Sequence, residues 1–521
     1  MISDKTDIQS TRYLRQMGQI SFQSSVSLVG TVFTVAIGYF FKVYIAHRLG
    51  AAALGIYTLG MSAVGLVTLI ATLGLPLAAT RFVATYSSTK QMDRLRALLV
   101  RGVILITIVS LALGVLMALS RGWVATLFNQ PYLSNYVPFF ALLVPLSALG
   151  VFFGQVLRGY KAVTRNVIVS NFIQFPTKIV LTIGMFALGF GLWGYIGADI
   201  FSTFIAVSVL AWSVNRRTPL AVRMQRGPLL RLEPAIISLA LVSIGTNLIG
   251  IVSGQTDRIL LGIYSDIRQV GIYSIVLTTV AFVPTLLRAV NSIFGPVIAE
   301  LYAAQDRETL LTLFQTLTKW TFALTFPLVL VIVAFAPAIM RLFGAEFEAG
   351  WLPLALMTCG ELVNVGTGSV GFMLLMSGNQ NLELIDSIIN MTVTLLLYFV
   401  LIPRMSILGA GISASMSNIL VNLLRLWQVK RRLGITPYNR SYWRLVLPVT
   451  VSVLATIVIH QLTASIAWPA WIDVILTLFT AYGCFGLCVL GVGLNETDRL
   501  LARSLWTRIQ DRVKMRSGGL M

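Results

Sequence analysis

The chain has 521 residues, of which 57% are hydrophobic and only 11% are charged, and its mean hydropathy is +0.84. Soluble domains carry roughly 25% charged residues, so this composition leaves too little polar surface to cover a water-exposed globule. The composition excludes a soluble enzyme and a soluble nucleic-acid-binding protein. The net charge of +20 therefore needs another explanation, which its distribution along the chain supplies.

The apolar residues are grouped into runs that are long enough to cross a membrane. A transmembrane helix needs about 20 predominantly apolar residues, and we count about fourteen such runs. We therefore predict an all-α integral membrane protein with no separate soluble domain. The runs cover residues 25–46, 55–78, 98–119, 136–157, 167–190, 192–212, 235–253 with an extension to 263, 270–294, 322–343, 352–376, 385–402, 408–427, 445–462 and 470–494.

The connections between successive apolar runs are alternately rich and poor in basic residues. If the N-terminus is cytoplasmic, most of the 39 Lys and Arg residues lie in inner connections or in the C-terminal tail. Such a bias sets the orientation of membrane proteins, so we predict that both termini are cytoplasmic. The basic residues then face an anionic inner leaflet, which explains the net charge without nucleic acid. The outer connections hold little more than Arg48, Arg121, Arg258, Arg268, Arg341 and Arg404.

The two ends of the chain differ from the apolar runs. The first residues are polar, and the first apolar run is too long for a cleavable signal peptide. Residues 495–521 are predicted to form a cytoplasmic amphipathic helix at the membrane surface. Its apolar stripe would contain Leu500, Leu501, Leu505, Ile509 and Val513.

The sequence repeats itself at an offset of about 216 residues, a feature of transporters built from two halves. Gly55-Ile56-Tyr57 matches Gly271-Ile272-Tyr273, and Leu157-Arg158-Gly159-Tyr160 aligns with Met376-Ser377-Gly378-Asn379. We predict two parallel six-helix bundles, 1–215 and 216–432. Transmembrane helices 13 and 14, in 433–494, are an appendage, and the tail 495–521 follows.

A few cations lie inside the apolar runs, where an unpartnered charge is costly. The repeat places Lys42 opposite Arg258, and Lys178 lies in the middle of its run. These cations could form a chamber for an anionic head group. Alternatively, Lys42 could extend its side chain to the interface, and Asp257 could neutralise Arg258. Arg81, which could also reach the interface, and Arg288 complete the basic candidates.

Acidic residues in or near the runs are candidates for ion coupling, namely Asp199, Glu361 and Asp386. Each could equally be a buried partner for a nearby cation. No ATP-binding pattern is present, so we expect an H⁺ or Na⁺ gradient, the membrane potential or the substrate gradient to supply energy. The cysteines Cys359, Cys484 and Cys488 lie in apolar runs and predict no disulfide framework, metal site or other cofactor.

Several motifs resemble those of bacterial oligosaccharide and polysaccharide flippases. They are the stretch from Arg48 to Tyr57, Leu73-Gly74-Leu75-Pro76, the segment from Arg81 to Tyr86, Leu157-Arg158-Gly159-Tyr160 and the counterpart that ends at Asn379. These flippases belong to the multidrug/oligosaccharidyl-lipid/polysaccharide exporter superfamily. The likeness covers the first twelve runs and consists mainly of glycines that let helices approach closely.

The resemblance implies a V-shaped pair of bundles in the bacterial cytoplasmic membrane and a non-enzymatic function. It implies transfer of an undecaprenyl-pyrophosphate-linked oligosaccharide to the outer leaflet by alternating access. Membrane lipids and the machinery that polymerises or exports the polysaccharide would be its partners, with no nucleic acid. Lys42, Lys178, Arg258 and Arg288 would contact the cargo. The two extra runs favour the lipid II and sporulation branches. A drug/cation antiporter and a membrane glycan polymerase or ligase are the alternatives.

Overall fold

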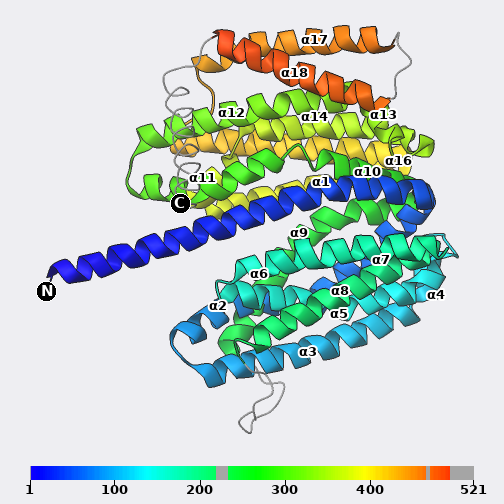
Figure 1. The fold of residues 1–521 in the computed structure, drawn as a ribbon, viewed down its shortest axis with the longest axis vertical. Helices are drawn as coiled ribbons and strands as arrows, with labels where there is room; N and C mark the ends of the chain where they lie inside the picture. Colours follow the sequence, from blue (N-terminus) through cyan, green and yellow to red (C-terminus); the bar gives the residue numbers. More distant parts are fainter. Residues whose placement is uncertain (1, 219–232, 465–469, 493–521) are drawn as a thin grey trace, which may run out of the picture. The chain divides into compact units, whose positions relative to one another are not determined.

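The computed structural model describes residues 2–218, 233–464 and 470–492, and the regular elements within these ranges are all helical (Figure 1). The chain divides into two compact units, Met1–Ser274 and Ile275–Met521. An all-helical chain suits a bilayer, because a helix satisfies its backbone hydrogen bonds within one segment. The predicted all-α class is therefore confirmed.

The first unit is a bundle in which α3 packs on α5, α5 on α8, and α7 on α8 (Figure 1). The connections between its elements are short where the structure describes them. Its elements are α1 (Ile2–Ala71), α2 (Leu75–Ser88), α3 (Met92–Leu119), α4 (Arg121–Leu127), α5 (Leu133–Gly159), α6 (Val163–Ile168), the π-helix η1 (Val169–Gln174), α7 (Phe175–Ala187), α8 (Gly191–Asn215), α9 (Pro234–Tyr264) and the start of α10 (Ile267–Val280).

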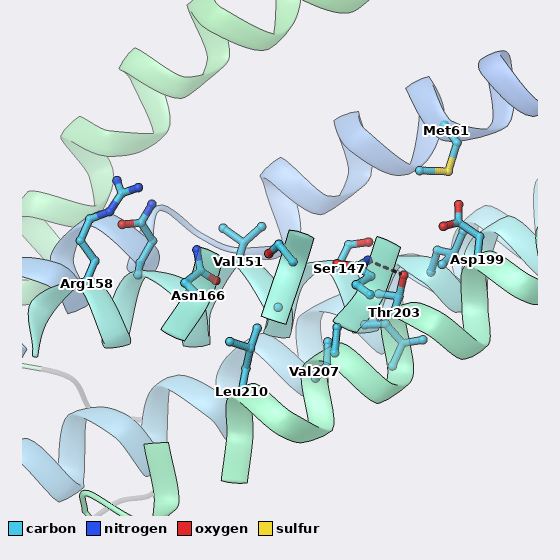
Figure 2. Close-up of a pocket in the computed structure, with 17 residues that line it drawn as sticks. Met61, Ser147, Val151, Arg158, Asn166, Asp199, Thr203, Val207 and Leu210 are labelled. Carbon is cyan, nitrogen blue, oxygen red and sulfur yellow. Dashed lines mark hydrogen bonds between the residues drawn. The ribbon is translucent and has the colours of Figure 1, made fainter. Parts of the chain in front are cut away.

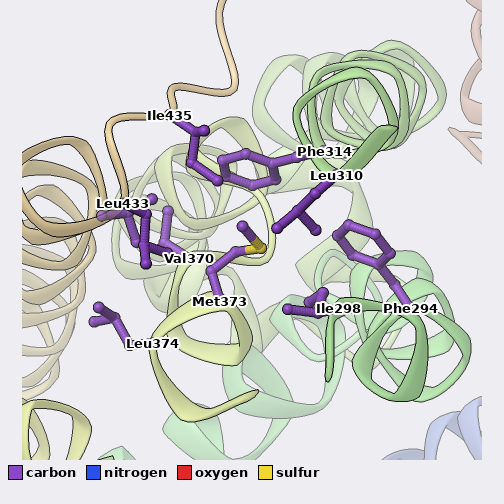
Figure 3. Close-up of a cluster of buried hydrophobic side chains, with 10 residues drawn as sticks. Phe294, Ile298, Leu310, Phe314, Val370, Met373, Leu374, Leu433 and Ile435 are labelled. Carbon is purple, nitrogen blue, oxygen red and sulfur yellow. The ribbon is translucent and has the colours of Figure 1, made fainter. Parts of the chain in front are cut away.

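The second unit continues from α10 and contains a core formed by ten buried side chains (Figure 3). Phe294 of α11 and Phe314 of α12 meet Met373 of α15 in this core. The remaining elements are α11 (Thr285–Ala303), α12 (Arg307–Ala334), α13 (Ala336–Arg341), the 3₁₀-helix η2 (Ala345–Gly350), α14 (Trp351–Thr367), α15 (Val370–Met376), α16 (Gln380–Leu433), the 3₁₀-helix η3 (Arg440–Leu445), α17 (Val446–Ala464) and α18 (Ala470–Val492).

Within the described ranges, eight helices are long and apolar enough to cross a membrane, or up to ten if each bent pair is one span. In the described part of the chain, the predicted runs fall on helices apart from short breaks such as residues 72–74 and 188–190. Two runs share α1 around Gly50 (φ 76°, ψ 173°), and two share α16 around Ser406 (φ 52°, ψ −129°). The protein is thus a multi-pass helical membrane protein. The count of fourteen and the V shape remain predictions.

Two repeat-matched glycines mark a close helix crossing in the first unit. A methyl group added at Gly55 of α1 would overlap the carbonyl oxygen of Ile267 in α10. A methyl group at Gly271 of α10 would overlap the carbonyl oxygen of Ala51. The Gly-Ile-Tyr motifs therefore lie where two backbones touch, as expected for glycines between membrane helices.

Gly74 joins α1 to α2 and has a left-handed backbone (φ 68°, ψ 0°). Its missing side chain also gives space to the carbonyl oxygen of Ala240 in α9. Because α9 packs on both α1 and α2, it belongs to the first compact unit. The predicted boundary of the repeat at residue 215 remains a prediction, and the predicted tail helix 495–521 lies outside the described residues.

Candidate functional site

An ion pair lies between two helices of the first unit. Lys178 of α7 places its Nζ 2.8 Å from Oδ1 of Asp199 in α8. The same amine donates to the hydroxyl of Tyr57 over 2.8 Å, and that hydroxyl donates to Oδ2 of Asp199 over 2.5 Å. The side chains of Lys178 and Asp199 are only 16% and 8% exposed. Good geometry and additional hydrogen bonds are what a buried pair needs to offset its desolvation.

Two aromatic rings complete the surroundings of Lys178. Its amine lies 4.9 Å from the ring centroid of Tyr195 and 5.1 Å from that of Tyr57. The two ring centroids are 4.4 Å apart. A cation near aromatic faces is stabilised by about 0.5–2 kcal/mol per contact. Lys178 is therefore held by a carboxylate, a hydroxyl and two rings.

Arg258 of α9 has a different kind of partner. Its guanidinium donates to Oε1 of Gln255 over 2.7 Å, and Ser62 of α1 donates to the same oxygen over 2.9 Å. The carboxylate of Asp257 accepts from the backbone N–H of Arg258 over 2.8 Å. Among the described side chains, Asp257 and Arg258 form no ion pair, and Nε of Arg258 has no hydrogen-bond partner. One N–H of the guanidinium is therefore buried without a hydrogen bond.

Lys42 of α1 joins these groups into one cluster. Its amine donates to the backbone oxygen of Ser274 over 3.0 Å. Arg258 and Lys178 both act electrostatically on it. Lys42, Lys178, Arg258, Asp199 and Asp257 form what we call the cationic cluster. The cluster thus contains three basic and two acidic side chains.

A polar pocket of about 400 Å³ lies beside the cluster in the first unit (Figure 2). Asp199 lies toward one end of the pocket and Arg158 toward the other. Between them, Gln174 of η1 donates to the hydroxyl of Thr203 over 3.1 Å. Asp199 therefore faces both the ion pair and a pocket lined with hydroxyl and amide groups, which is polar enough to hold water.

Two further predicted basic residues, Arg81 and Arg288, have surroundings of their own. Arg81 is exposed on α2, with its guanidinium 6.0 Å from the ring centroid of Phe82. Arg288 is exposed on α11 of the second unit and donates to the backbone oxygen of Ala281 over 2.8 Å. The structure thus brings together Lys42, Lys178, Asp257 and Arg258 of the predicted set, joined by Asp199 from the coupling candidates.

The remaining acidic candidates lie in the second unit and have amide partners. Glu361 of α14 accepts from Asn364 over 2.9 Å and from Asn418 of α16 over 3.0 Å. Asp386 is buried in α16 and accepts from Gln428 over 2.7 Å. Across the described parts of the chain, no group of three or more His, Cys, Asp or Glu residues could hold a metal ion.

The sequence did not identify four residues of this site, namely Tyr57, Ser62, Tyr195 and Gln255. Tyr57 was visible as part of the repeated Gly-Ile-Tyr motif, and Gln255 as an amide within an apolar run. An amide at membrane depth needs a partner, so Gln255 carried a usable signal. Tyr195 carried none, because aromatic residues are common throughout membrane spans.

One comparison with known proteins identifies a family, and another identifies a fold. A family model described as "Polysaccharide biosynthesis protein" matches residues 49–350, more than half of the chain. No curated protein matches the chain. Solved structures match at low sequence identity, so they bear on the fold alone.

Three solved structures illustrate the likeness. The lipid II flippase MurJ in an inward closed conformation has a TM-score of 0.70 at 14% identity, over 89% of this chain and 97% of that chain. An inward-facing multidrug resistance MATE family transporter of the MOP superfamily has a TM-score of 0.62 at 16% identity, over 79% and 98%. A MATE transporter from Vibrio cholerae has a TM-score of 0.55 at 16% identity, over 82% and 98%. The chain therefore shares its fold with these transporter and flippase structures.

Proposed function

Because the chain belongs to the polysaccharide biosynthesis protein family, we propose that it is a flippase for an undecaprenyl-pyrophosphate-linked oligosaccharide. It moves this lipid from the cytoplasmic leaflet to the outer leaflet of the bacterial cytoplasmic membrane by alternating access, for cell-surface polysaccharide synthesis. Its partners are the lipid-linked oligosaccharide, the surrounding lipids and the machinery that polymerises or exports the glycan. The family match and the transporter fold support this proposal.

The observation that carries the proposal is that three basic side chains, Lys42, Lys178 and Arg258, lie together in the first unit. Lys178 pairs with Asp199, Lys42 donates to the backbone oxygen of Ser274, and Arg258 donates to the Gln255 amide. Basic side chains at membrane depth mark the pathways of ligands and ions. A pyrophosphate would accept charge-assisted hydrogen bonds from such side chains. It would also stabilise the charged form of the Lys42 amine.

Ion coupling can be assigned to Asp199 within the same proposal. This carboxylate faces the polar pocket that reaches Arg158, so protons or Na⁺ from an aqueous phase could approach it. Neutralising Asp199 would release the Lys178 amine from its partner and strengthen the attraction for an anionic cargo. Glu361 and Asp386, whose oxygens accept from amides, are the corresponding candidates in the second unit.

A drug/cation antiporter is the second candidate, since the fold also matches MATE transporters. Such a transporter needs a carboxylate that is available to a cationic drug. Asp199 is engaged by Lys178 and Tyr57, and Asp257 lies beside Arg258. This arrangement favours an anionic cargo. The neighbours are transporters and flippases, so we propose no enzymatic activity, and a glycan polymerase or ligase remains the weakest alternative.

The test measures the lipid-linked glycan on each leaflet after depletion of the protein in its host, using a membrane-impermeant probe outside. We expect the pyrophosphate-linked glycan to accumulate on the inner leaflet.

Wild-type protein restores export, whereas Lys42→Ala with Arg258→Ala lowers the rate at least about tenfold, which corresponds to about 1.4 kcal/mol. Arg216→Ala is the matched control, because Arg216 is exposed and stacks on Trp212. Normal export in depleted cells, with no second flippase present, would overturn the proposal in favour of drug efflux.

A further inference from the structure

The polar pocket that begins at Asp199 is large enough for a small organic ligand. Its volume of about 400 Å³ lies within the range of about 300–1,000 Å³ that is usual for ligand sites. Two of its lining residues, Val151 and Arg158, are exposed, so the pocket is open to the surface of the first unit. Only Asp199 and Arg158 of the lining are charged, and they lie toward opposite ends (Figure 2). The space between them therefore suits an uncharged ligand.

The polar part of the lining offers hydrogen-bonding groups that the protein itself does not use. Ser147 of α5, Asn166 of α6 and Ser170 of η1 line the pocket and form no side-chain hydrogen bond with the described residues. Gln174 donates one N–H to the hydroxyl of Thr203 over 3.1 Å. Amides and hydroxyls can both donate and accept hydrogen bonds, so a ligand with several hydroxyl groups would satisfy them.

The other part of the lining is apolar. Val207 and Leu210 of α8 are three residues apart and so lie on the same face of the helix. They line the pocket together with Val151 of α5 (Figure 2). A sugar ring combines the same two characters, because its C–H groups are apolar and its hydroxyl groups are polar. The pocket is thus complementary to a sugar ring, whereas a hard metal cation needs several oxygen ligands around one point.

Two glycines of α5 and a π-helix shape the pocket. A methyl group at Gly154 would lie 2.9 Å from Oδ1 of Asn166, so the glycine gives the amide its place against α5. Gly150, about one turn earlier, leaves the pocket wall without a side chain. The π-helix η1 forms another wall, and π-helices are rare and frequently lie at functional sites. The fold therefore maintains the pocket through several local features.

We propose that this pocket binds a sugar ring of the lipid-linked glycan and thereby selects the glycan that is transported. This inference rests on the proposed flippase function. Asp199 lines the pocket and pairs with Lys178 of the cationic cluster, so a glycan whose pyrophosphate is attracted to these basic side chains brings its sugars close to the pocket. A glycan that lacks the matching hydroxyl groups leaves polar groups of the pocket unpaired, which lowers its affinity.

The experiment measures binding of two lipids to the purified full-length protein in micelles. One is the lipid-linked glycan extracted from depleted host cells, and the other is undecaprenyl pyrophosphate, which has no sugar. Asn166→Leu with Ser170→Ala removes two hydrogen-bonding groups from the pocket. We expect this variant to bind the glycan lipid at least about tenfold more weakly and to bind undecaprenyl pyrophosphate as wild type does. Asn135→Leu with Ser208→Ala is the matched control, because both residues are exposed and neither lines the pocket.

A second variant guards against misfolding of the first. Ser147→Phe fills the pocket, and Ser208→Phe is its control on an exposed position of α8. We expect the same selective loss of the glycan lipid in Ser147→Phe. Unchanged binding of undecaprenyl pyrophosphate then shows that the variant is folded.

Two results would overturn the sugar site. In the first, both pocket variants bind the glycan lipid as wild type does, although the flippase proposal survives. In the second, variants that unfold at the wild-type temperature lose both lipids equally, which would mean that the pocket does not recognise the sugar. Failure of the flippase proposal is distinguishable, because depleted cells would then export the glycan normally and the wild-type protein would bind neither lipid.

Discussion

The carboxylate of Asp199 depends on Lys178 more than on any other residue, because the amine supplies both the opposite charge and a hydrogen bond at 2.8 Å. Removing one partner of a buried pair leaves an uncompensated charge, at a cost of about 3–5 kcal/mol. We therefore expect Lys178→Ala to lower the midpoint of thermal unfolding in micelles substantially. Tyr57→Phe should have a smaller effect, since it removes one hydrogen bond and leaves the ion pair.

The double variant Lys178→Ala with Asp199→Ala is the control for this prediction. It removes both charges, so its stability should exceed that of Lys178→Ala alone. With Asp199→Ala as the second single variant, the effect of the double variant minus the sum of the two single effects measures the coupling between the side chains. A double variant whose loss equals the sum of the losses in Lys178→Ala and Asp199→Ala would show that the pair is not coupled. In that case Asp199 would owe its stability to the Tyr57 hydroxyl and the polar pocket.

Tyr86 lies outside the predicted spans and allows a prediction of how stability depends on pH. It is 4% exposed at the end of α2, and its hydroxyl donates to Oε2 of Glu233 over 2.7 Å. Burial, followed by this hydrogen bond, raises the pKa of Tyr86 from 10.0 to about 12. Because the folded pKa exceeds the unfolded one, the contribution to stability is complete below pH 10 and is lost as the pH rises from about 10 to about 12.

The measurement for Tyr86 is an ultraviolet titration of phenolate formation, compared between wild type and Tyr86→Phe. The difference isolates one hydroxyl among the 16 tyrosines of the chain. It should show a single transition near pH 12, which Glu233→Gln moves downward by removing a charged acceptor. A transition near pH 10 in the wild type would contradict the burial of the Tyr86–Glu233 contact.

The crossing of α1 and α10 shows how a helix contact can follow from a repeated motif. Gly55 and Gly271 each lie against the backbone of the opposite helix, so a side chain at either position has no space. We expect Gly55→Leu and Gly271→Leu to destabilise the folded protein by about 1–3 kcal/mol or more, as overpacking does. Thermal unfolding in micelles measures this effect.

Gly197→Ala is the reference for these glycine variants. A methyl group at Gly197 of α8 would meet no atom within 4 Å, so this substitution should keep or slightly raise stability. If Gly55→Leu were as stable as Gly197→Ala, the close approach of α1 to α10 would be wrong. The sequence predicted closely packed glycines, but it did not identify which helices meet at them.

The sequence predicted the existence of the helices better than it predicted where each helix begins, bends or ends. Hydropathy predicted the helical runs because a bilayer demands about 20 apolar residues in each span. It did not predict that α1 continues through Gly50, or that α16 turns at Ser406, a non-glycine residue with φ 52°. It also missed the π-helix η1, which adds a residue to one helical turn and brings Gln174 to the pocket wall. These features depend on tertiary contacts.

For the whole molecule, the sequence located the charges and left their pairing open. Lys42, Lys178 and Arg258 were recognisable because isolated cations in apolar runs are rare. The choice of Asp199 as partner of Lys178 depends on how α7 and α8 are rotated about their axes, which hydropathy does not specify. The Gln255 amide between Ser62 and Arg258 depends likewise on the packing of α1 against α9.

The orientation of the molecule in the membrane is the remaining prediction, and it rests on the basic connections. Ser88 and Thr126 are both exposed. Ser88 precedes the start of α3, and Thr126 of α4 follows the end of α3. Basic residues accumulate near Ser88, with Arg81, Lys90 and Arg94 in its vicinity, so this end should face the cytoplasm. Thr126 in α4 should then face outward.

Cysteine labelling of intact cells tests this orientation. The native Cys359, Cys484 and Cys488 are first replaced by Ala, and a single cysteine is introduced by Ser88→Cys or Thr126→Cys. A membrane-impermeant maleimide should label Thr126→Cys in intact cells, and it should label Ser88→Cys only after permeabilisation. Labelling of Ser88→Cys alone in intact cells would reverse the topology. Both predicted cytoplasmic termini would then lie outside.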